Sequence, residues 1–237
     1  MTHGAKLPVF GYWSDDDHSS LANFTREWSA EFPQFQVFGD REVVPLVARH
    51  FPGNVDLYRA LRIPAAKADI ARLLLLYEFG GLYIDCHFGI RNADEIRRLI
   101  SLLERMELIL VDRMQSLKPR PPGEHFVVNG VMFSRPRSDL IFMICRQAFV
   151  NLAQHREQER KMGKVRYGIF RLTGAPLVNA TVLQPGSHNR NIRSDFEGRI
   201  VIVPEEVAPI ERGRHRTYGG PGRHWSERQK FELLFEI

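Results

Sequence analysis

Asp85 and His87 are the residue pair with the clearest chemical potential in this sequence. They follow a short apolar stretch, Leu82–Ile84, which comes directly after Gly80-Gly81. If the strand continues, side chains two positions apart point to the same side of it. A carboxylate with an imidazole suits a divalent cation of intermediate softness such as Mn²⁺, whereas Mg²⁺ prefers oxygen ligands throughout. The alternative interpretation is a hydrogen bond within a turn, with Cys86 as an ordinary core residue on the opposite side.

Asp69 and Arg72 form a second polar pair, in a segment that is predicted to be a helix from Ala65 to Phe79. Because they stand three residues apart, they project from one helix face beside an apolar stripe. One interpretation is a helix-surface ion pair worth roughly 0.3 to 0.5 kcal/mol. The other is a carboxylate and a guanidinium offered to sugar hydroxyls and phosphate, because Arg binds phosphate oxygens bidentately. Spacing alone favours the surface ion pair.

The hydrophobic pattern predicts alternating strands and helices that would position these residues. Strands are expected at 7–13, 34–38, 82–84, 108–111, 126–133 and 199–203, and helices at 21–32, 41–51, 65–79, 94–106 and 139–161, with a further short helix starting near 173–176. This order predicts an α/β layer architecture, in which ligands bind near the carboxyl ends of the strands.

Composition bounds the class of protein. The 237 residues, of which 43% are hydrophobic and 26% charged, fit a single folded domain with a sizeable core. The net charge of +5 permits a phosphate-bearing partner but does not by itself imply nucleic acid. Phosphate-loop, nucleophile-elbow and dinucleotide-fingerprint motifs are all missing from the sequence, which removes the commonest NTPase, hydrolase and dehydrogenase interpretations.

Cysteine usage and hydropathy predict a cytoplasmic location. Cys86 and Cys145 are too few for a disulfide framework, and a reducing compartment is the default. The first residues lack the apolar core of a signal peptide, and the longest apolar run, Leu73–Tyr77, is too short to span a bilayer. The basic cluster Arg212, Arg214 and Arg216 leaves peripheral contact with anionic lipid open, although a solvated basic face explains it equally simply.

The run from Ala68 to His87 resembles the signature of the DXD-containing sugar-transferring glycosyltransferases. That pattern is approximately A-D-x-x-R-x-x-x-L-Y-x-x-G-G-x-Y-x-D-x-D, and only its last Asp is missing here. The family includes bacterial capsular-polysaccharide and fungal mannosyl transferases, and it is similar to the catalytic domains of the clostridial glucosylating toxins. The resemblance implies one GT-A domain over residues 1–237, with a Rossmann-like mixed sheet flanked by helices. Residues 1–90 would be the nucleotide-sugar-binding half, and 91–237 the acceptor half with a C-terminal closing loop.

The resemblance also implies roles for individual residues. Trp13 would stack on the nucleotide base, although a core aromatic is the alternative. Asp69 and Arg72 would hold the donor sugar and its neighbouring phosphate. Tyr83 and Asp85 would lie next to the ribose and the metal-bound diphosphate.

His87 is the departure from the family pattern, because it stands where the second, metal-binding Asp is usual. The polypeptide N-acetylgalactosaminyltransferases bind manganese with a D-x-H version, so the change is compatible with a metal held by Asp85 and His87. The alternative is that the substitution marks a lost activity.

The C-terminal tail resembles the late loop that closes the site in GT-A enzymes. His224 is the expected third metal ligand, with Trp225 and Ser226 beside it near the diphosphate, and His215 is the competing candidate. A loop at Gly219–Gly222 would close over the donor; a frayed basic tail is the alternative. Asn129 would hydrogen-bond the donor or acceptor sugar, or else mark a strand bulge or turn.

Taken together, the resemblance implies a transferase that needs Mn²⁺ or Mg²⁺ and retains anomeric configuration. The donor would be a nucleotide-diphosphate sugar, with a UDP-sugar favoured. The acceptor would be the hydroxyl of a glycan, a lipid-linked glycan or a protein, with polysaccharide biosynthesis as one setting and nucleic acid excluded as a partner. Two alternatives stay open: a catalytically inactive module that binds nucleotide sugar or glycan, and a toxin-like protein glycosyltransferase.

Overall fold

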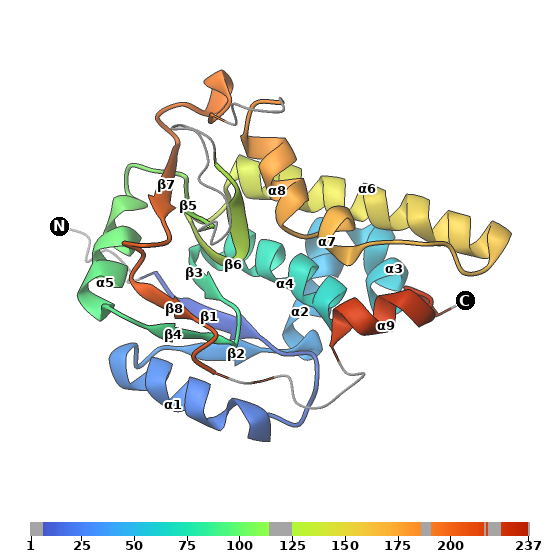
Figure 1. Cartoon of the computed structure of the whole chain (residues 1–237), viewed down its shortest axis with the longest axis horizontal. Coiled ribbons are helices and arrows are strands. Elements are labelled where there is room, and N and C mark those ends of the chain that lie inside the picture. Colours follow the sequence, from blue (N-terminus) through green and yellow to red (C-terminus); the bar gives the residue numbers. More distant parts are fainter. Residues whose placement is uncertain (1–6, 114–124, 186–190, 216, 218–223, 237) are drawn as a thin grey trace.

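A six-stranded sheet forms the centre of the computed structural model, which describes residues 7–113, 125–185, 191–215, 217 and 224–236 (Figure 1). In spatial order β2-β1-β3-β6-β5-β7, the strands are β2 (Gln36–Phe38), β1 (Val9–Tyr12), β3 (Gly81–Ile84), β6 (Val127–Ser134), β5 (Leu108–Asp112) and β7 (Ile200–Pro204). β6 runs antiparallel to β3 and β5, whereas the β1–β2, β1–β3 and β5–β7 pairs are parallel. The predicted α/β class with a mixed sheet is confirmed.

Helices cover both faces of this sheet (Figure 1). The side chains of Val9 and Phe10 point to opposite faces, as alternate strand residues must, and enter two separate hydrophobic cores. One core includes residues of α1 (Ala22–Glu31) and α5 (Ala93–Leu102). The larger core includes residues of α2 (Asp40–His50), α3 (Val55–Arg59), α4 (Pro64–Phe79), α6 (Asp139–Met162), α7 (Ile169–Leu172) and α8 (Ala175–Val182).

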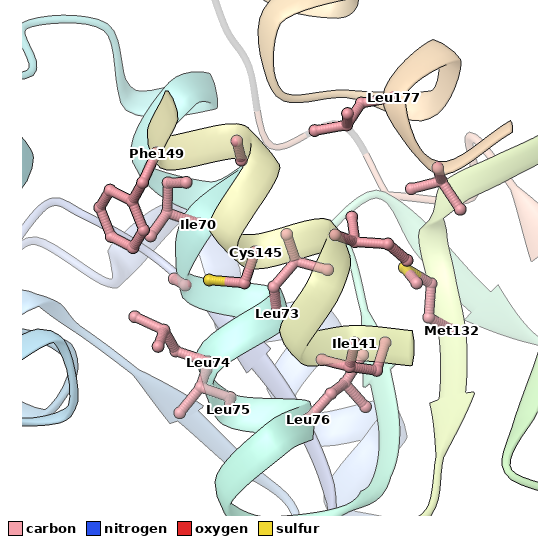
Figure 2. Packing of buried hydrophobic residues seen from close by; sticks show 14 of the residues in the cluster. Ile70, Leu73, Leu74, Leu75, Leu76, Met132, Ile141, Cys145, Phe149 and Leu177 are labelled. Carbon is pink, nitrogen blue, oxygen red and sulfur yellow. The ribbon is translucent and has the colours of Figure 1, made fainter. Parts of the chain in front are cut away.

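The helix α4 carries two of the predicted functional residues, Asp69 and Arg72, and is buried on nearly all sides. Pro64 occupies its first turn, and Gly80, with φ of +65°, caps its C-terminus. Its Ile70 and Leu73 pack with Ile141 and Cys145 of α6 and Met132 of β6 in the larger core (Figure 2). A Cβ on Gly81 would lie 2.0 Å from the carbonyl oxygen of Pro8, so the turn into β3 requires glycine. Helix and strand are thus fixed relative to each other where the polar residues emerge.

Most expected elements are present, with ends shifted by a few residues, but several short ones were not predicted. These are the antiparallel pair β4 (Phe88–Ile90) and β8 (Ile210–Arg212), the helices α3, α7 and α9 (Trp225–Phe231), and the 3-10 turns Ser19–Leu21, Pro52–Asn54 and Ser194–Phe196. Within the described ranges, no helix has both the length and the apolar character needed to cross a bilayer.

Candidate active site

A cavity of about 430 Å³ opens at the carboxyl end of β3 and gathers most of the predicted site residues. Its lining includes Asp69, Arg72, Asp85, His87, Asn129 and Trp225. Arg113, Phe170, Arg212 and His224 also line it. The cavity therefore presents cationic side chains over a floor that contains two carboxylates, a charge pattern that suits an anionic and polyhydroxylated ligand.

Arg72 is the centre of this floor. Its Nη1 lies 2.8 Å from Oδ1 of Asp69, and its Nη2 lies 2.9 Å from Oδ1 of Asp85. Both ends of the Asp69–Arg72 pair are buried, at 6% and 4% exposed, so the expectation of a helix-surface ion pair is wrong. Asn129 of β6, Thr173 and Asp85 bind this pair, and helix spacing gives no information about contacts with residues elsewhere in the chain. Burial works against the guanidinium, but Asp85 and Tyr83 outweigh it, so the pKa of Arg72 stays above its ordinary value and the group is a permanent cation.

Asp69 is held by donors from three elements. Besides Arg72, it accepts a hydrogen bond from Asn129 Nδ2 at 2.8 Å and one from Thr173 Oγ1 at 2.7 Å. Burial raises the pKa of Asp69, although Arg72 and Thr173 oppose that effect. Thr173 follows α7 and was predicted only as a helix start, because no local pattern reveals a partner 104 residues away.

Asp85 and His87 reach the cavity from a turn. β3 ends at Ile84, and the Phe88 amide donates to the Asp85 carbonyl at 3.0 Å, so the expected strand continuation is replaced by a turn over residues 85–88. Both side chains nevertheless line the cavity, while Cys86 is buried as expected. Burial lowers the pKa of His87, although Asp85 opposes it, which favours the neutral imidazole that could ligate a metal.

Gly130 lies directly against Asp85. The Asp85 amide donates to the Gly130 carbonyl at 2.7 Å, and a Cβ on Gly130 would stand 2.6 Å from Asp85 Oδ2. The pairing of β5 with β6 shifts between Leu110 and Val111, opposite this stretch of β6. Asn129 therefore lies in the irregular part of β6, where one of its predicted alternatives placed it, and it also lines the cavity.

Tyr83 lies behind Asp85. It is 0% exposed, and its hydroxyl donates to Asp85 Oδ1 at 2.8 Å. The resemblance implied that Tyr83 bounds the ribose; the structure instead places its side chain where it orients the carboxylate. Burial and the neighbouring Asp85 raise the pKa of Tyr83 well above its ordinary value, so the hydroxyl remains a donor.

A second cavity, of about 870 Å³, adjoins the first. Ala65, Ala68 and Trp225 line both, and Trp13 lines only the larger one. Trp13 is half-buried against the smaller core, and its indole nitrogen donates to the Asp17 carbonyl at 3.2 Å. Its ring is thus held at one end of a two-part cleft whose other end contains Arg72.

The late segment divides into residues that reach the cleft and residues that do not. His224 and Trp225 line the smaller cavity, and His224 Nδ1 accepts from the Ser226 amide at 3.3 Å and lies 2.6 Å from Ser226 Oγ. His215 Nε2 instead lies 2.6 Å from Glu27 Oε2, away from the cavity lining. The proposed closing loop at Gly219–Gly222 lies outside the described residues.

Two other histidines lie against carboxylates, and one of these pairs has the i,i+4 spacing of a helix. His125 Nδ1 lies 2.8 Å from Asp112 Oδ2, and His155 Nε2 lies 3.2 Å from Glu159 Oε1. Of the basic cluster considered for lipid contact, Arg214 pairs with Glu27 and Glu211. Arg212 lines the cavity, and Arg216 lies outside the described residues.

Asp85 and His87 offer two donor atoms for a divalent metal ion, which would need further ligands from a bound molecule such as a diphosphate. Asp85 Oδ1 is occupied by Arg72 and Tyr83, while no hydrogen bond from the described part of the chain reaches its Oδ2. Together with the imidazole of His87, this gives one oxygen and one nitrogen donor on the same cavity wall. Within those residues, no group of three His, Cys, Asp or Glu side chains could hold a metal. The pair therefore fits a divalent ion only where phosphate and water supply further ligands.

The sequence matches one family model. Residues 16–100 match the glycosyltransferase sugar-binding region containing the DXD motif, which confirms the resemblance. The matched part contains Asp69, Arg72, Tyr83, Asp85 and His87. No curated protein matches the chain.

The chain is also similar, at low identity, to several solved structures of glycosyltransferases. The PaToxG glycosyltransferase is 11% identical over 75% of this chain and 68% of its own, with a TM-score of 0.44. The UDP-bound glycosyltransferase domain from the YGT toxin is 11% identical over 70% of this chain and 52% of its own, with a TM-score of 0.41. A glycosyltransferase involved in glycosylation of the major capsid of PBCV-1 is 8% identical over 95% and 98%, with a TM-score of 0.39. This chain thus spans about half of the YGT domain.

Proposed function

We propose that the chain transfers a sugar from a nucleotide-diphosphate donor to an acceptor hydroxyl, a proposal supported by the match of residues 16–100 to the glycosyltransferase sugar-binding region. The observation that carries this proposal is the buried Arg72, which joins Asp69 and Asp85 at the floor of a cavity. Two carboxylates around one fixed cation provide acceptors for sugar hydroxyls and a counter-charge for phosphate in one place.

The two adjoining cavities fit the parts of such a donor. The nucleotide base would lie against Trp13 in the larger cavity, and the diphosphate and sugar would lie over Arg72 in the smaller one. Ala65 and Ala68, which line both cavities, leave space between them because their side chains are small. A UDP-sugar is the donor that the family resemblance favours.

Charge development explains how these residues would promote transfer. As the bond between sugar and phosphate breaks, negative charge builds on the departing diphosphate. Arg72 stays cationic throughout, and Arg113 and Arg212 lie on the same cavity wall. Asp69, held by Asn129 and Thr173, would fix a donor hydroxyl and so orient the sugar.

A divalent metal, Mn²⁺ or Mg²⁺, is part of this proposal. Asp85 and His87 would hold it, and phosphate and water would complete its ligands; His224 lines the same cavity, but in the described part of the chain these three side chains do not form a metal-holding group. When bound, such an ion stabilises negative charge on the leaving diphosphate. The family resemblance supports retention of configuration, which anomer-resolved NMR of the product tests directly.

Donor binding and turnover test the proposal together. Wild-type protein should bind UDP and a UDP-sugar more tightly with Mn²⁺ than without it in calorimetry, and should release UDP slowly without an acceptor. Asp85→Asn should abolish the metal-dependent part of both and keep the fold. Asp195→Asn, an exposed aspartate of the turn Ser194–Phe196, is the matched control.

Other outcomes would contradict parts of the proposal. Binding without any turnover would favour an inactive nucleotide-sugar-binding module. Metal-independent turnover in Asp85→Asn would contradict the proposed metal site at Asp85 and His87. His87→Asp should retain activity and move the preference towards Mg²⁺, because a carboxylate replaces the softer imidazole. The acceptor, whether glycan, lipid-linked glycan or protein, is identified by which of them becomes labelled.

A further inference from the structure

One end of the molecule combines exposed apolar side chains with unpaired basic ones. Phe231, at the end of α9, is 81% exposed, and Met162, at the end of α6, is 66% exposed. Arg160, Arg166, Arg171 and Lys230 are exposed as well. We call these six residues the basic-apolar end.

Hydrogen bonds bring the end of α9 and the segment after α6 together. Lys164 Nζ donates to the carbonyls of Gln229 at 3.0 Å and Glu232 at 2.9 Å, and Tyr167 donates to the Glu232 carbonyl at 3.0 Å. The segment that follows Met162 is therefore packed against the end of α9 that carries Phe231. Figure 1 shows the C-terminal end of α6 beside α9 at one extreme of the long axis, with α5 at the other.

The charges at this end are not balanced by neighbouring carboxylates. Among the described residues, Arg160, Arg166, Arg171 and Lys230 form none of the ion pairs within 4.0 Å, whereas Arg97 and Arg98 of α5, and Arg214 beside α1, do. The nearby acids are engaged otherwise: Glu157 pairs with Lys161, and Glu232 pairs with Arg228. Glu227 and Glu236 are further exposed acids near α9. Four cations that form no ion pair within the described part of the chain and two exposed apolar side chains thus occur at the same end of the molecule.

We propose that the basic-apolar end docks on an anionic lipid surface. Apolar side chains that insert at the headgroup boundary, ringed by Lys and Arg that attract anionic lipid, are the two components of interfacial binding. An exposed phenylalanine alone is ordinary on a protein surface. Its occurrence at one end of the molecule with a second exposed apolar side chain and an excess of basic side chains is what selects a negatively charged bilayer as the occupant.

Docking there would place the cleft near the bilayer. Arg171 directly follows Phe170, which lines the smaller cavity. An acceptor held at a membrane surface would then meet the cavity from the side of α7. The docking itself does not depend on the proposed function, because it uses no residue of the cleft.

Vesicle sedimentation with the full chain tests this. The protein should bind vesicles of phosphatidylcholine with about 30% phosphatidylserine and not vesicles of phosphatidylcholine alone, and binding should fall as salt rises from about 0.1 to 0.5 M. The double variant Arg166→Glu/Lys230→Glu should weaken binding about tenfold or more. Met162→Ser/Phe231→Ser should also weaken it, at unchanged charge.

The matched control is Arg105→Glu/Val207→Ser. Val207 is as exposed as Met162, and Arg105 is an exposed arginine after α5 at the opposite end of the molecule. This control should bind like wild type, and all variants should keep their melting temperature and donor affinity. Equal binding to neutral vesicles, no binding to anionic ones, or equal losses in the control would overturn the proposal. If the wild-type protein does not bind the donor, that result contradicts the proposed transferase function and not the docking.

Discussion

At the scale of single residues, the site depends on how one carboxylate is held. Burial raises the pKa of the Asp69 carboxyl, and Arg72, Thr173 and Asn129 oppose that rise. A buried acceptor that loses a hydrogen-bond donor costs about 1 to 3 kcal/mol. Thr173 thus contributes to the site without touching its cavity.

Thr173→Val keeps the shape and removes the hydroxyl. We expect the free energy of unfolding to fall by about 1 to 3 kcal/mol and donor affinity to fall with it, because Asp69 becomes easier to protonate. Urea denaturation and calorimetry with UDP-sugar measure the two effects. Thr181→Val, which removes a hydroxyl bonded to its own helix at Leu177, should leave donor affinity unchanged. A donor affinity equal to wild type in Thr173→Val would show that Asp69 needs no such support.

Gly130 offers a second test at this scale. Gly130→Ala places a methyl group 2.6 Å from Asp85 Oδ2 and 2.9 Å from the Phe88 ring, so the carboxylate must move. Turnover should drop at least tenfold while the circular dichroism spectrum stays native, since displacements of about 1 Å in a site cost about a hundredfold. Gly53→Ala, where a Cβ meets nothing within 4 Å, is the control. Normal turnover in Gly130→Ala would mean that Asp85 tolerates displacement.

The sequence was most informative at the level of residue identity. Asp85 and His87 do reach one cavity, and the family signature selected Asp69 and Arg72 against what their spacing suggested. The sequence did not reveal that Tyr83 supports Asp85 from behind, because a strand pattern indicates alternation and not which face is buried. Arg113 and Arg212 were missed for a similar reason, since only the fold brings them to the cavity.

At the scale of elements, a buried carboxylate of α6 fixes the C-terminal segment. Glu159 Oε1 accepts the amide of Leu234 at 2.9 Å, and its Oε2 accepts that of Phe235 at 3.1 Å. The same segment includes α9, which begins at Trp225 on the wall of both cavities. Glu159 is therefore a positioning residue for that wall.

Glu159→Leu should loosen α9. Two orphaned amides cost about 1 to 3 kcal/mol each, so the melting temperature should fall, and KM for the donor should rise more than kcat falls. Proteolysis should release the C-terminal segment before the rest of the chain. The exposed neighbour Glu157→Leu is the control. An unchanged KM at a lowered melting temperature would restrict Glu159 to stability.

Element prediction succeeded where segments were long and failed where they were short. The periodicity of α4 and α6 gave their bounds within a residue or two, because many turns contribute to the signal. β4 and β8, with three residues each, pair residues as far apart as Phe88 and Arg212, 124 positions along the chain, and no local pattern reports such a pair. The turn at Asp85 depends on that pairing, which is why the strand was expected to continue.

At the scale of the whole molecule, Glu107 connects three elements. Its carboxylate accepts from Ser138 Oγ at 2.8 Å, from the Leu140 amide at 3.2 Å and from Arg199 Nη2 at 2.6 Å, and so links β5, α6 and β7. Burial would raise the pKa of Glu107, but Ser138 and Arg199 lower it below its ordinary value of 4.5.

The pH dependence of stability follows from that direction. A carboxyl with a lowered pKa in the folded state contributes stability above 4.5 that is lost as pH falls through its folded value. The melting temperature should therefore fall below pH 4.5, and Glu107→Gln should be less stable at neutral pH and show a shallower fall. Glu104→Gln, an exposed neighbour, should follow the wild-type curve. If the melting temperature of Glu107→Gln falls at low pH as steeply as that of the wild type, then other carboxyls cause the acid sensitivity.

The position of β6 in the sheet has a consequence for synthesis. β3, which precedes Asp85, is flanked by β1 and by β6, and β6 is translated only after residue 126 has been added. Until then the nascent chain exposes the edge of β3, and Gly130, which lies against Asp85, has not yet been synthesised. During translation, β3 therefore stays unpaired on this side until β6 has been synthesised. Slow translation between β3 and β6 would prolong that exposure and favour aggregation over folding.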